Sequence, residues 1–149
     1  MSRRAAPSTF FCDTTVLVAA SDTVHQHHAL SLALVATAKP DFAFCAAHTL
    51  AELYATLTAT PPPRVRRTAD VLANVEHAAS VFTAVSLEAA DYRWVLSRCA
   101  STGIRSGQVF DALILKAAER ANVDTIYTWN VAHFARIAWP AVAGRIKTP

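Results

Sequence analysis

The sequence lacks the features that mark several large classes of protein. It contains no Cys-x-x-Cys pair, no internal repeat and no low-complexity segment, and no apolar run reaches the roughly 18 residues of a membrane span. Only 17% of the residues are charged and 53% are hydrophobic, which excludes a disordered chain. The three cysteines, Cys12, Cys45 and Cys99, are widely spaced and odd in number, which predicts reduced, buried thiols in a cytoplasmic protein.

The length and charge of the chain indicate its domain organisation and the kind of partner it could bind. We expect the 149 residues to form one domain over 1–149, with its core in about 10–140. The N-terminus (Met1–Arg4) is basic, but Asp13 falls where an export signal would be apolar, so no signal peptide is expected. A net charge of +3 and a pI near 9.0 are compatible with a polyanionic partner.

The stretch Phe10–Ala20 is an almost continuous apolar run, rich in β-branched residues. Such a run predicts a strand buried on both faces of a parallel sheet. Asp13 interrupts it, and an ionised carboxylate buried without a partner would cost several kcal/mol. It should therefore meet a metal ion or a hydrogen-bonding neighbour. This stretch alone is consistent with a site carboxylate and equally with a residue at a strand end.

The rest of the chain alternates between predicted helices and strands. A helix starting at Thr49 is stopped by the prolines at 61–63. Apolar patterns predict further strands at 42–46, 81–85 and 125–128, and further helices at 25–38, 68–79, 87–100 and 108–121. The helix at 87–100 is expected to begin at an N-cap formed by Ser86. This alternation predicts an α/β fold in which a parallel sheet lies within a single sandwich.

Two more acids fall near predicted helix starts. Thr49 and Glu52 match a capping box, although a Glu just after a strand end is also where α/β domains gather site residues. Asp111 lies in the first turn of the helix at 108–121, where the helix dipole favours an anion. Each acid thus has a structural and a functional interpretation. Thr128 and Asn130 follow the last long strand, at the end where open α/β sheets place their sites.

These positions can converge at the carboxyl edge of one sheet. Asp13, Glu52 and Asp111 would repel one another there unless a divalent cation neutralised them. Carboxylate oxygens select Mg²⁺ or Mn²⁺ rather than zinc. Such a cluster suits phosphodiester hydrolysis, because the metal activates water and stabilises the charge that develops on the phosphate.

With these residues in view, the chain resembles the PIN domain, and more closely the VapC-type ribonuclease toxins of bacterial toxin–antitoxin pairs. The matching motifs are Asp13-Thr14 after an apolar lead-in, Thr-x-x-Glu ending at Glu52, Phe110–Ile114, and Tyr127–Phe134 with its Thr-x-Asn and His-Phe elements. The resemblance extends from about Phe10 to Pro149. It implies a three-layer α/β/α sandwich with a central, mainly parallel sheet of four to five strands.

The resemblance also implies roles for individual residues. Asp13 and Asp111 would be Mg²⁺ ligands, Glu52 the third acidic member, and Thr14 would orient the first carboxylate by a hydrogen bond. Many PIN domains have a further acid near the last strand, where this chain has Asn130 and His133, and one or two metal ions remain open. The family further implies an RNA substrate, a homodimer and a VapB-like antitoxin protein as partners.

Other interpretations remain for parts of the sequence. Arg64, Arg66 and Arg67 form the strongest basic cluster and are either a solvated helix start or contacts to a nucleic-acid phosphate or a protein partner. A phosphatase of the haloacid dehalogenase type needs a second acid two residues after Asp13, but Thr15 stands there. The alternative to an enzyme is a PIN-like module that binds RNA or a partner without cutting, although the presence of all three acids disfavours it.

Overall fold

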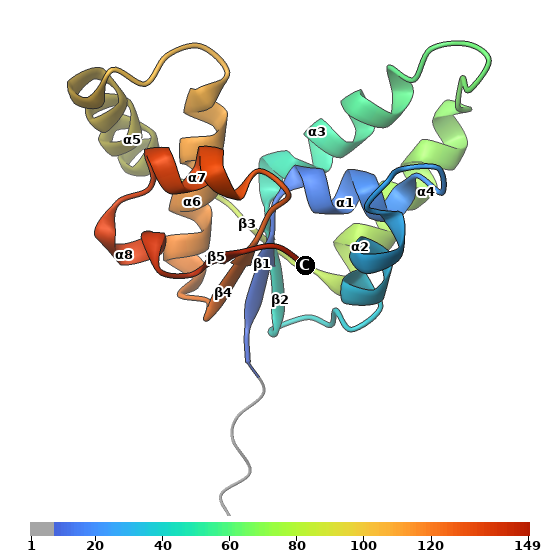
Figure 1. Cartoon of the computed structure of the whole chain (residues 1–149), viewed down its shortest axis with the longest axis horizontal. Helices are drawn as coiled ribbons and strands as arrows, with labels where there is room; N and C mark the ends of the chain where they lie inside the picture. The colour runs from blue at the N-terminus through green and yellow to red at the C-terminus, as the bar shows by residue number, and fades with distance from the viewer. Residues whose placement is uncertain (1–7) are drawn as a thin grey trace, which may run out of the picture.

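Five short parallel strands form the central sheet (Figure 1). The computed structural model describes residues 8–149. The spatial order of the strands is β3-β2-β1-β4-β5. Their bounds are Phe10–Cys12 (β1), Ala43–Ala46 (β2), Thr83–Val85 (β3), Thr125–Tyr127 (β4) and Ile146–Lys147 (β5). The predicted α/β class, with a parallel sheet of four to five strands, is confirmed.

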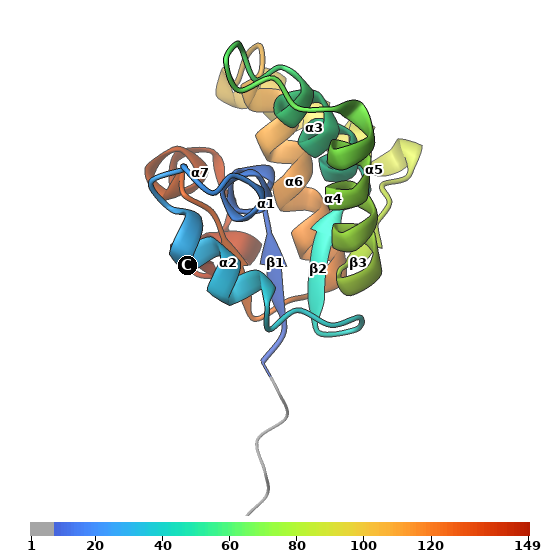
Figure 2. The ribbon, with the colours of Figure 1, turned by 90° about the vertical axis from the view of Figure 1, so that its right-hand side faces the viewer.

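Helices cover both faces of the sheet and complete a three-layer sandwich (Figures 1 and 2). One layer holds α1 (Thr14–Ser21), α2 (His28–Val35), α3 (Ala47–Thr58) and α4 (Thr68–Val81). The other holds α5 (Ala89–Thr102), α6 (Gln108–Ala121), α7 (Val131–Ile137) and α8 (Pro140–Ala143). Each layer has its own apolar core against the sheet: one includes Val16, Leu53 and Val71, the other Leu115 and Phe134. The two cores exclude water from both faces of the sheet and hold its strands in place, so that the strands end at one common edge.

The first strand is much shorter than predicted. It ends at Cys12, and Thr14–Ser21 form helix α1, with Asp13 as its N-cap. The β-branched residues favoured a strand locally, but the Asp13 carboxylate accepts a hydrogen bond from the backbone N–H of Val16 at 3.2 Å. Aspartate is among the strongest N-cap residues, and this bond satisfies a donor that the helix start leaves free. Asp13 therefore stands between strand and helix, rather than within a strand.

Two predicted helix starts are also wrong. Helix α3 begins at Ala47, and its N-cap, Ala46, makes no side-chain bond. The expected capping box of Thr49 and Glu52 is absent, so the Glu52 carboxylate is available for other contacts. Ser86 was expected to be the N-cap of a helix that begins at Leu87. Helix α5 instead begins at Ala89, because Glu88 is its N-cap and forms a capping box with Asp91.

Two further findings concern the cysteines and the length of the apolar helices. Cys12, Cys45 and Cys99 are buried free thiols, as predicted. Among residues 8–149, no helix has both the length and the apolar character needed to cross a membrane. The basic residues Met1–Arg4 lie outside the described residues.

Candidate active site

The candidate site lies where the strand order reverses. The chain moves from β1 to β2 and β3 on one side, and β4 and β5 lie on the other, so β1 and β4 flank the switch point at which open α/β sheets bind ligands. Asp13 directly follows β1, and Thr128 directly follows β4. The Thr128 hydroxyl donates to Asp13 Oδ2 at 2.7 Å, which joins the two strand ends.

The Asp13 carboxylate is buried and held by hydrogen bonds on both oxygens. Its side chain is 1% exposed. The Thr15 hydroxyl donates to Oδ1 at 2.7 Å and in turn accepts the N–H of Trp129 at 3.1 Å. Thr128 accepts the N–H of Asn130 at 3.0 Å in the same way. Two threonines thus connect Asp13 to the backbone that follows β4, which fixes the orientation of the carboxylate.

Burial nonetheless dominates the ionisation of this group. It raises the pKa of Asp13 to about 6, although the hydrogen bonds from Thr15, Thr128 and Val16 act in the opposite direction, and the charge of Asp111 raises the pKa further. An aspartate kept buried beside another carboxylate costs stability when it is ionised. A nearby cation would relieve that cost.

Glu52 reaches the site from the second turn of α3. The Thr14 hydroxyl donates to Glu52 Oε2 and, at 3.3 Å, contacts the hydroxyl of buried Thr49. Thr14 was expected to orient Asp13, but it holds Glu52 instead. The His48 ring nitrogen Nε2 is buried, lies 3.9 Å from Glu52 Oε1 and has no hydrogen-bond partner in the described part of the chain. Thr14 therefore links the start of α1 to α3.

Asp111 lies in the first turn of α6, as the helix pattern predicted, and is paired with a histidine. His133 Nε2 lies 2.8 Å from Asp111 Oδ2, and Arg136 donates to His133 Nδ1 at 2.9 Å. Because a guanidinium has no acceptor, Nδ1 must be the unprotonated nitrogen, and Nε2–H then donates to Asp111. Burial raises the pKa of Asp111, the hydrogen bond from His133 counteracts it, and the charge of Glu52 adds to it.

The donor set fits a hard divalent cation by its chemistry. Three carboxylates face the same region, and the pKa of Asp13 responds to Asp111 as that of Asp111 does to Glu52. Asp111 Oδ1 and Glu52 Oε1 accept no hydrogen bond from residues 8–149. Within those residues, however, no three Asp, Glu, His or Cys side chains are grouped tightly enough to form a ready-made metal site. The oxygens suit Mg²⁺ or Mn²⁺ without already enclosing one.

The other residues that the sequence suggested for the site do not contact its three carboxylates in the described part of the chain. Asn130 is exposed and serves as the N-cap residue of α7 without a side-chain cap bond. Arg64 and Arg66 both pair with Asp22, at 2.5 and 3.2 Å, and Arg66 also donates to the Ser21 carbonyl at 2.8 Å. Much of their charge is thus used within the protein. Arg67 is exposed.

Two contributors to the site were missed in the sequence. Thr15 was noted only as a non-acidic residue, yet it bonds Asp13 directly. Arg136 was not considered, because nothing local marks it; its spacing of three residues from His133 on a helix is the signal that could have suggested the pair.

Comparisons with known proteins show the family and the fold of the chain. The family model of the PIN domain matches residues 10–140. A solved structure, VapBC2 from Rickettsia felis bound to a DNA fragment from their promoter, superimposes with a TM-score of 0.65 over 95% of this chain and 98% of that chain, at 18% sequence identity. At that identity the likeness shows the fold. No curated protein matches the chain.

Proposed function

The chain belongs to the PIN domain family, as its motifs predicted, and we propose that it is a Mg²⁺-dependent endoribonuclease that hydrolyses RNA phosphodiester bonds. The observation that carries this proposal is the buried Asp13 carboxylate at the switch point of the sheet, fixed by Thr15 and Thr128 and coupled to Asp111. Burial makes the ionised form of Asp13 destabilising, and carboxylates kept in such surroundings are typical of functional sites.

The residues have distinct roles in this proposal. Asp13, Glu52 and Asp111 would hold the cation, and Mn²⁺ could replace Mg²⁺. When bound, the cation would supply an activated water and offset the charge of the phosphate. Thr15 and Thr128 hold Asp13, while Thr14 holds Glu52. His133 leaves Asp111 Oδ1 free while it fixes Oδ2, so each carboxylate is oriented by a neighbour before any ligand arrives.

The biological setting is also a proposal. We propose that the whole chain, 1–149, acts as a single PIN domain and as the toxin of a VapBC-type pair, and that its activity is restrained by a VapB-like antitoxin protein in the cytoplasm. The likeness to the VapBC2 structure supports this setting. Tyr92 and Leu96 are exposed and lie one helical turn apart on α5, and they supply an apolar surface that a second copy could bury in a homodimer. Light scattering would distinguish a mass of 16.0 kDa from twice that value.

The test of the activity is RNA cleavage by the purified protein, freed of any antitoxin. Cleavage is measured with Mg²⁺, with Mn²⁺ and with EDTA, and in parallel with Asp111→Asn. We expect cleavage that needs the metal and is lost in the variant. Cleavage that persists in EDTA would contradict the metal-dependent mechanism. No cleavage by the folded protein with either metal would also contradict the proposal and would favour a PIN-like module that binds without cutting.

A further inference from the structure

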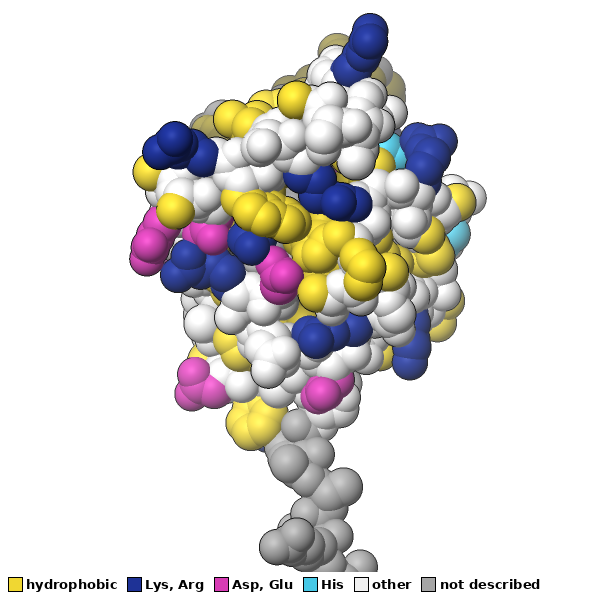
Figure 3. All heavy atoms as spheres, turned by 90° about the vertical axis from the view of Figure 1, so that its left-hand side faces the viewer, with side chains coloured by type: hydrophobic (Ala, Val, Ile, Leu, Met, Phe, Trp, Pro, Cys, Tyr) yellow, Lys and Arg dark blue, Asp and Glu magenta, His cyan; other side chains and the backbone are white. Residues whose placement is uncertain are grey.

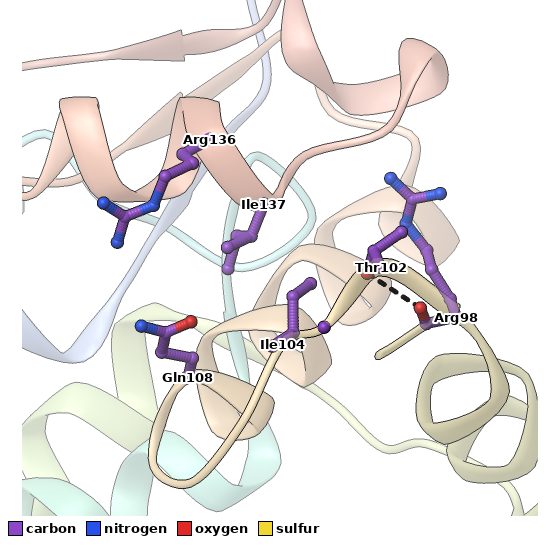
Figure 4. A pocket seen from close by; sticks show the side chains of 7 residues that line it. Arg98, Thr102, Ile104, Gln108, Arg136 and Ile137 are labelled. Atoms are coloured by element: carbon purple, nitrogen blue, oxygen red, sulfur yellow. Dashed lines mark hydrogen bonds between the residues drawn. The ribbon is translucent and has the colours of Figure 1, made fainter. Parts of the chain in front are cut away.

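A cavity of about 250 Å³ lies between the end of α5, the start of α6 and helix α7 (Figure 4). Ile104 and Ile137 line its middle, with Arg136 and Gln108 on one side of them and Arg98 on the other (Figure 4). Its volume is several times the roughly 30 Å³ that one water occupies in the liquid. The cavity can therefore admit a phosphate group together with solvent.

The two arginines of this cavity carry charge that no carboxylate neutralises. Within residues 8–149 neither Arg98 nor Arg136 forms an ion pair, and no acidic side chain lines the cavity. Arg136 donates to the unprotonated Nδ1 of His133. Arg98 donates to the Ala138 carbonyl at 3.3 Å, and its Nε is a buried donor that has no partner in the described part of the chain. A buried donor without a partner is uncommon in folded proteins, and the Arg98 guanidinium also lies over the Trp139 ring, 5.5 Å from its centroid.

The cavity adjoins the candidate active site. Gln108 lies one helical turn before Asp111 on α6, and Arg136 is joined to Asp111 through His133. Arg136 thus lies two hydrogen bonds from Asp111, a predicted metal ligand, and a ligand that contacted Arg136 would be connected to it. On the face built from α5, α7 and α8, both Lys or Arg and Asp or Glu side chains border a central hydrophobic patch, and the Lys and Arg side chains are the more numerous (Figure 3).

We infer that this cavity binds the backbone of single-stranded RNA beside the bond that is cut, with Arg98 and Arg136 contacting different phosphates. The inference rests on the proposed function and adds the place at which the substrate is held. Two guanidinium groups on opposite sides of the isoleucines suit a chain of repeating phosphates better than a lone phosphate, which a single fork of donors would bind. Their charge also offsets the repulsion between RNA and the three acids.

The salt dependence of RNA binding tests the inference, because each phosphate contact contributes a slope of about 0.7 in log affinity against log salt for single strands. We would measure anisotropy of a fluorescent single-stranded RNA of mixed sequence, with Asp13→Asn as the parent to prevent cleavage. Adding Arg98→Gln and Arg136→Gln together should lower the slope by about 1.4. Lysine at both positions should retain it, because lysine also binds phosphate as a point charge.

The matched control is Arg93→Gln, which removes an exposed charge from the same helix outside the cavity and should leave the slope unchanged. An unchanged slope in the double glutamine variant would overturn the inference. A change seen with 5′-phosphorylated RNA but not with 5′-hydroxyl RNA would assign the cavity to a terminal phosphate and overturn the backbone assignment. Weaker binding of an acidic peptide with an unchanged RNA slope would assign the arginines to a protein partner and do the same. Failure of the proposed cleavage leaves this binding measurement intact, so the two failures are distinguishable.

Discussion

The two aspartates of the site are held in very different ways. Asp13 is fully buried at the end of β1 and accepts hydrogen bonds on both oxygens from three donors. Asp111 is half-buried on α6, and its one side-chain hydrogen bond, from His133, leaves Oδ1 free. Burial raises the pKa of both carboxyls. The ends of β1 and β4 thus fix the orientation of Asp13. The orientation and pKa of Asp111 depend instead on His133, which in turn is held by Arg136.

This difference assigns separate tasks to the two sides of the site. The β1–β4 side supplies a rigid carboxylate whose ionisation costs stability. The α6–α7 side connects the other carboxylate to the cavity of Arg98 and Arg136, where we place the RNA backbone. Variants on the first side should change both stability and catalysis, and variants on the second mainly catalysis and substrate binding.

The largest effect on cleavage is expected on the β1–β4 side of the site. Asp13→Asn should lower the rate of RNA cleavage about a thousandfold, the upper end of the loss from removing one stabiliser of transition-state charge. Single-turnover cleavage with saturating Mg²⁺ measures it. The matched control, Asp70→Asn, removes an exposed carboxylate from α4 and should keep wild-type activity. Activity retained by Asp13→Asn would remove Asp13 from the mechanism.

The same side should govern the pH dependence of stability. With a pKa of about 6 in the folded protein and about 3.9 in the unfolded chain, Asp13 stays protonated in the folded state as the unfolded chain loses its proton. The free energy of unfolding should therefore fall by about 3 kcal/mol as pH rises from about 4 to about 6, and contribute no further change above that. Urea unfolding in EDTA measures it.

The control for this prediction is Asp13→Asn, which cannot ionise at that position. Its unfolding free energy should lack the Asp13 contribution between pH 4 and 6 and should exceed that of the wild type at pH 7. A variant that is less stable than the wild type at pH 7 would show that the carboxylate contributes more by its hydrogen bonds than its burial costs.

A smaller effect on cleavage is expected on the α6–α7 side of the site. His133→Ala should lower cleavage about 10- to 100-fold, as the loss of an outer-shell partner of a metal ligand does, and should change stability little because His133 is partly exposed. Thr15→Val is the counterpart on the β1–β4 side: it removes the bond to Asp13 Oδ1 and should lower both cleavage and stability. Equal stability losses in the two variants would erase the contrast between the sides.

Sequence reasoning succeeded where one local signal was strong. The amphipathic pattern of 108–121 gave the observed bounds of α6 and placed Asp111 in its first turn. The parallel α/β class followed from the alternation of elements, and the three acids do come to one edge of the sheet. Convergence could be predicted because the carboxyl ends of parallel strands share an edge.

The remaining contacts of the site could not be predicted, because they depend on where helix α1 begins and on residues far apart in the sequence. The β-branched residues after Asp13 favoured a strand, but the capping bond from the backbone of Val16 and packing against the sheet made them helical. Once Thr14 starts a helix, it turns toward Glu52, and Thr15 takes the bond to Asp13. Arg136 acts on Asp111 through His133, across 25 residues of sequence, and no local pattern reveals such a connection.

The most direct test of the central claim is Mn²⁺ binding, measured by electron paramagnetic resonance on the wild type and on Asp13→Asn, with Mg²⁺ as competitor. The claim that Asp13, Glu52 and Asp111 form one cation site predicts that the wild type binds Mn²⁺, that Mg²⁺ displaces it, and that Asp13→Asn loses the binding. Equal binding by the folded variant, or none by the wild type, would contradict it.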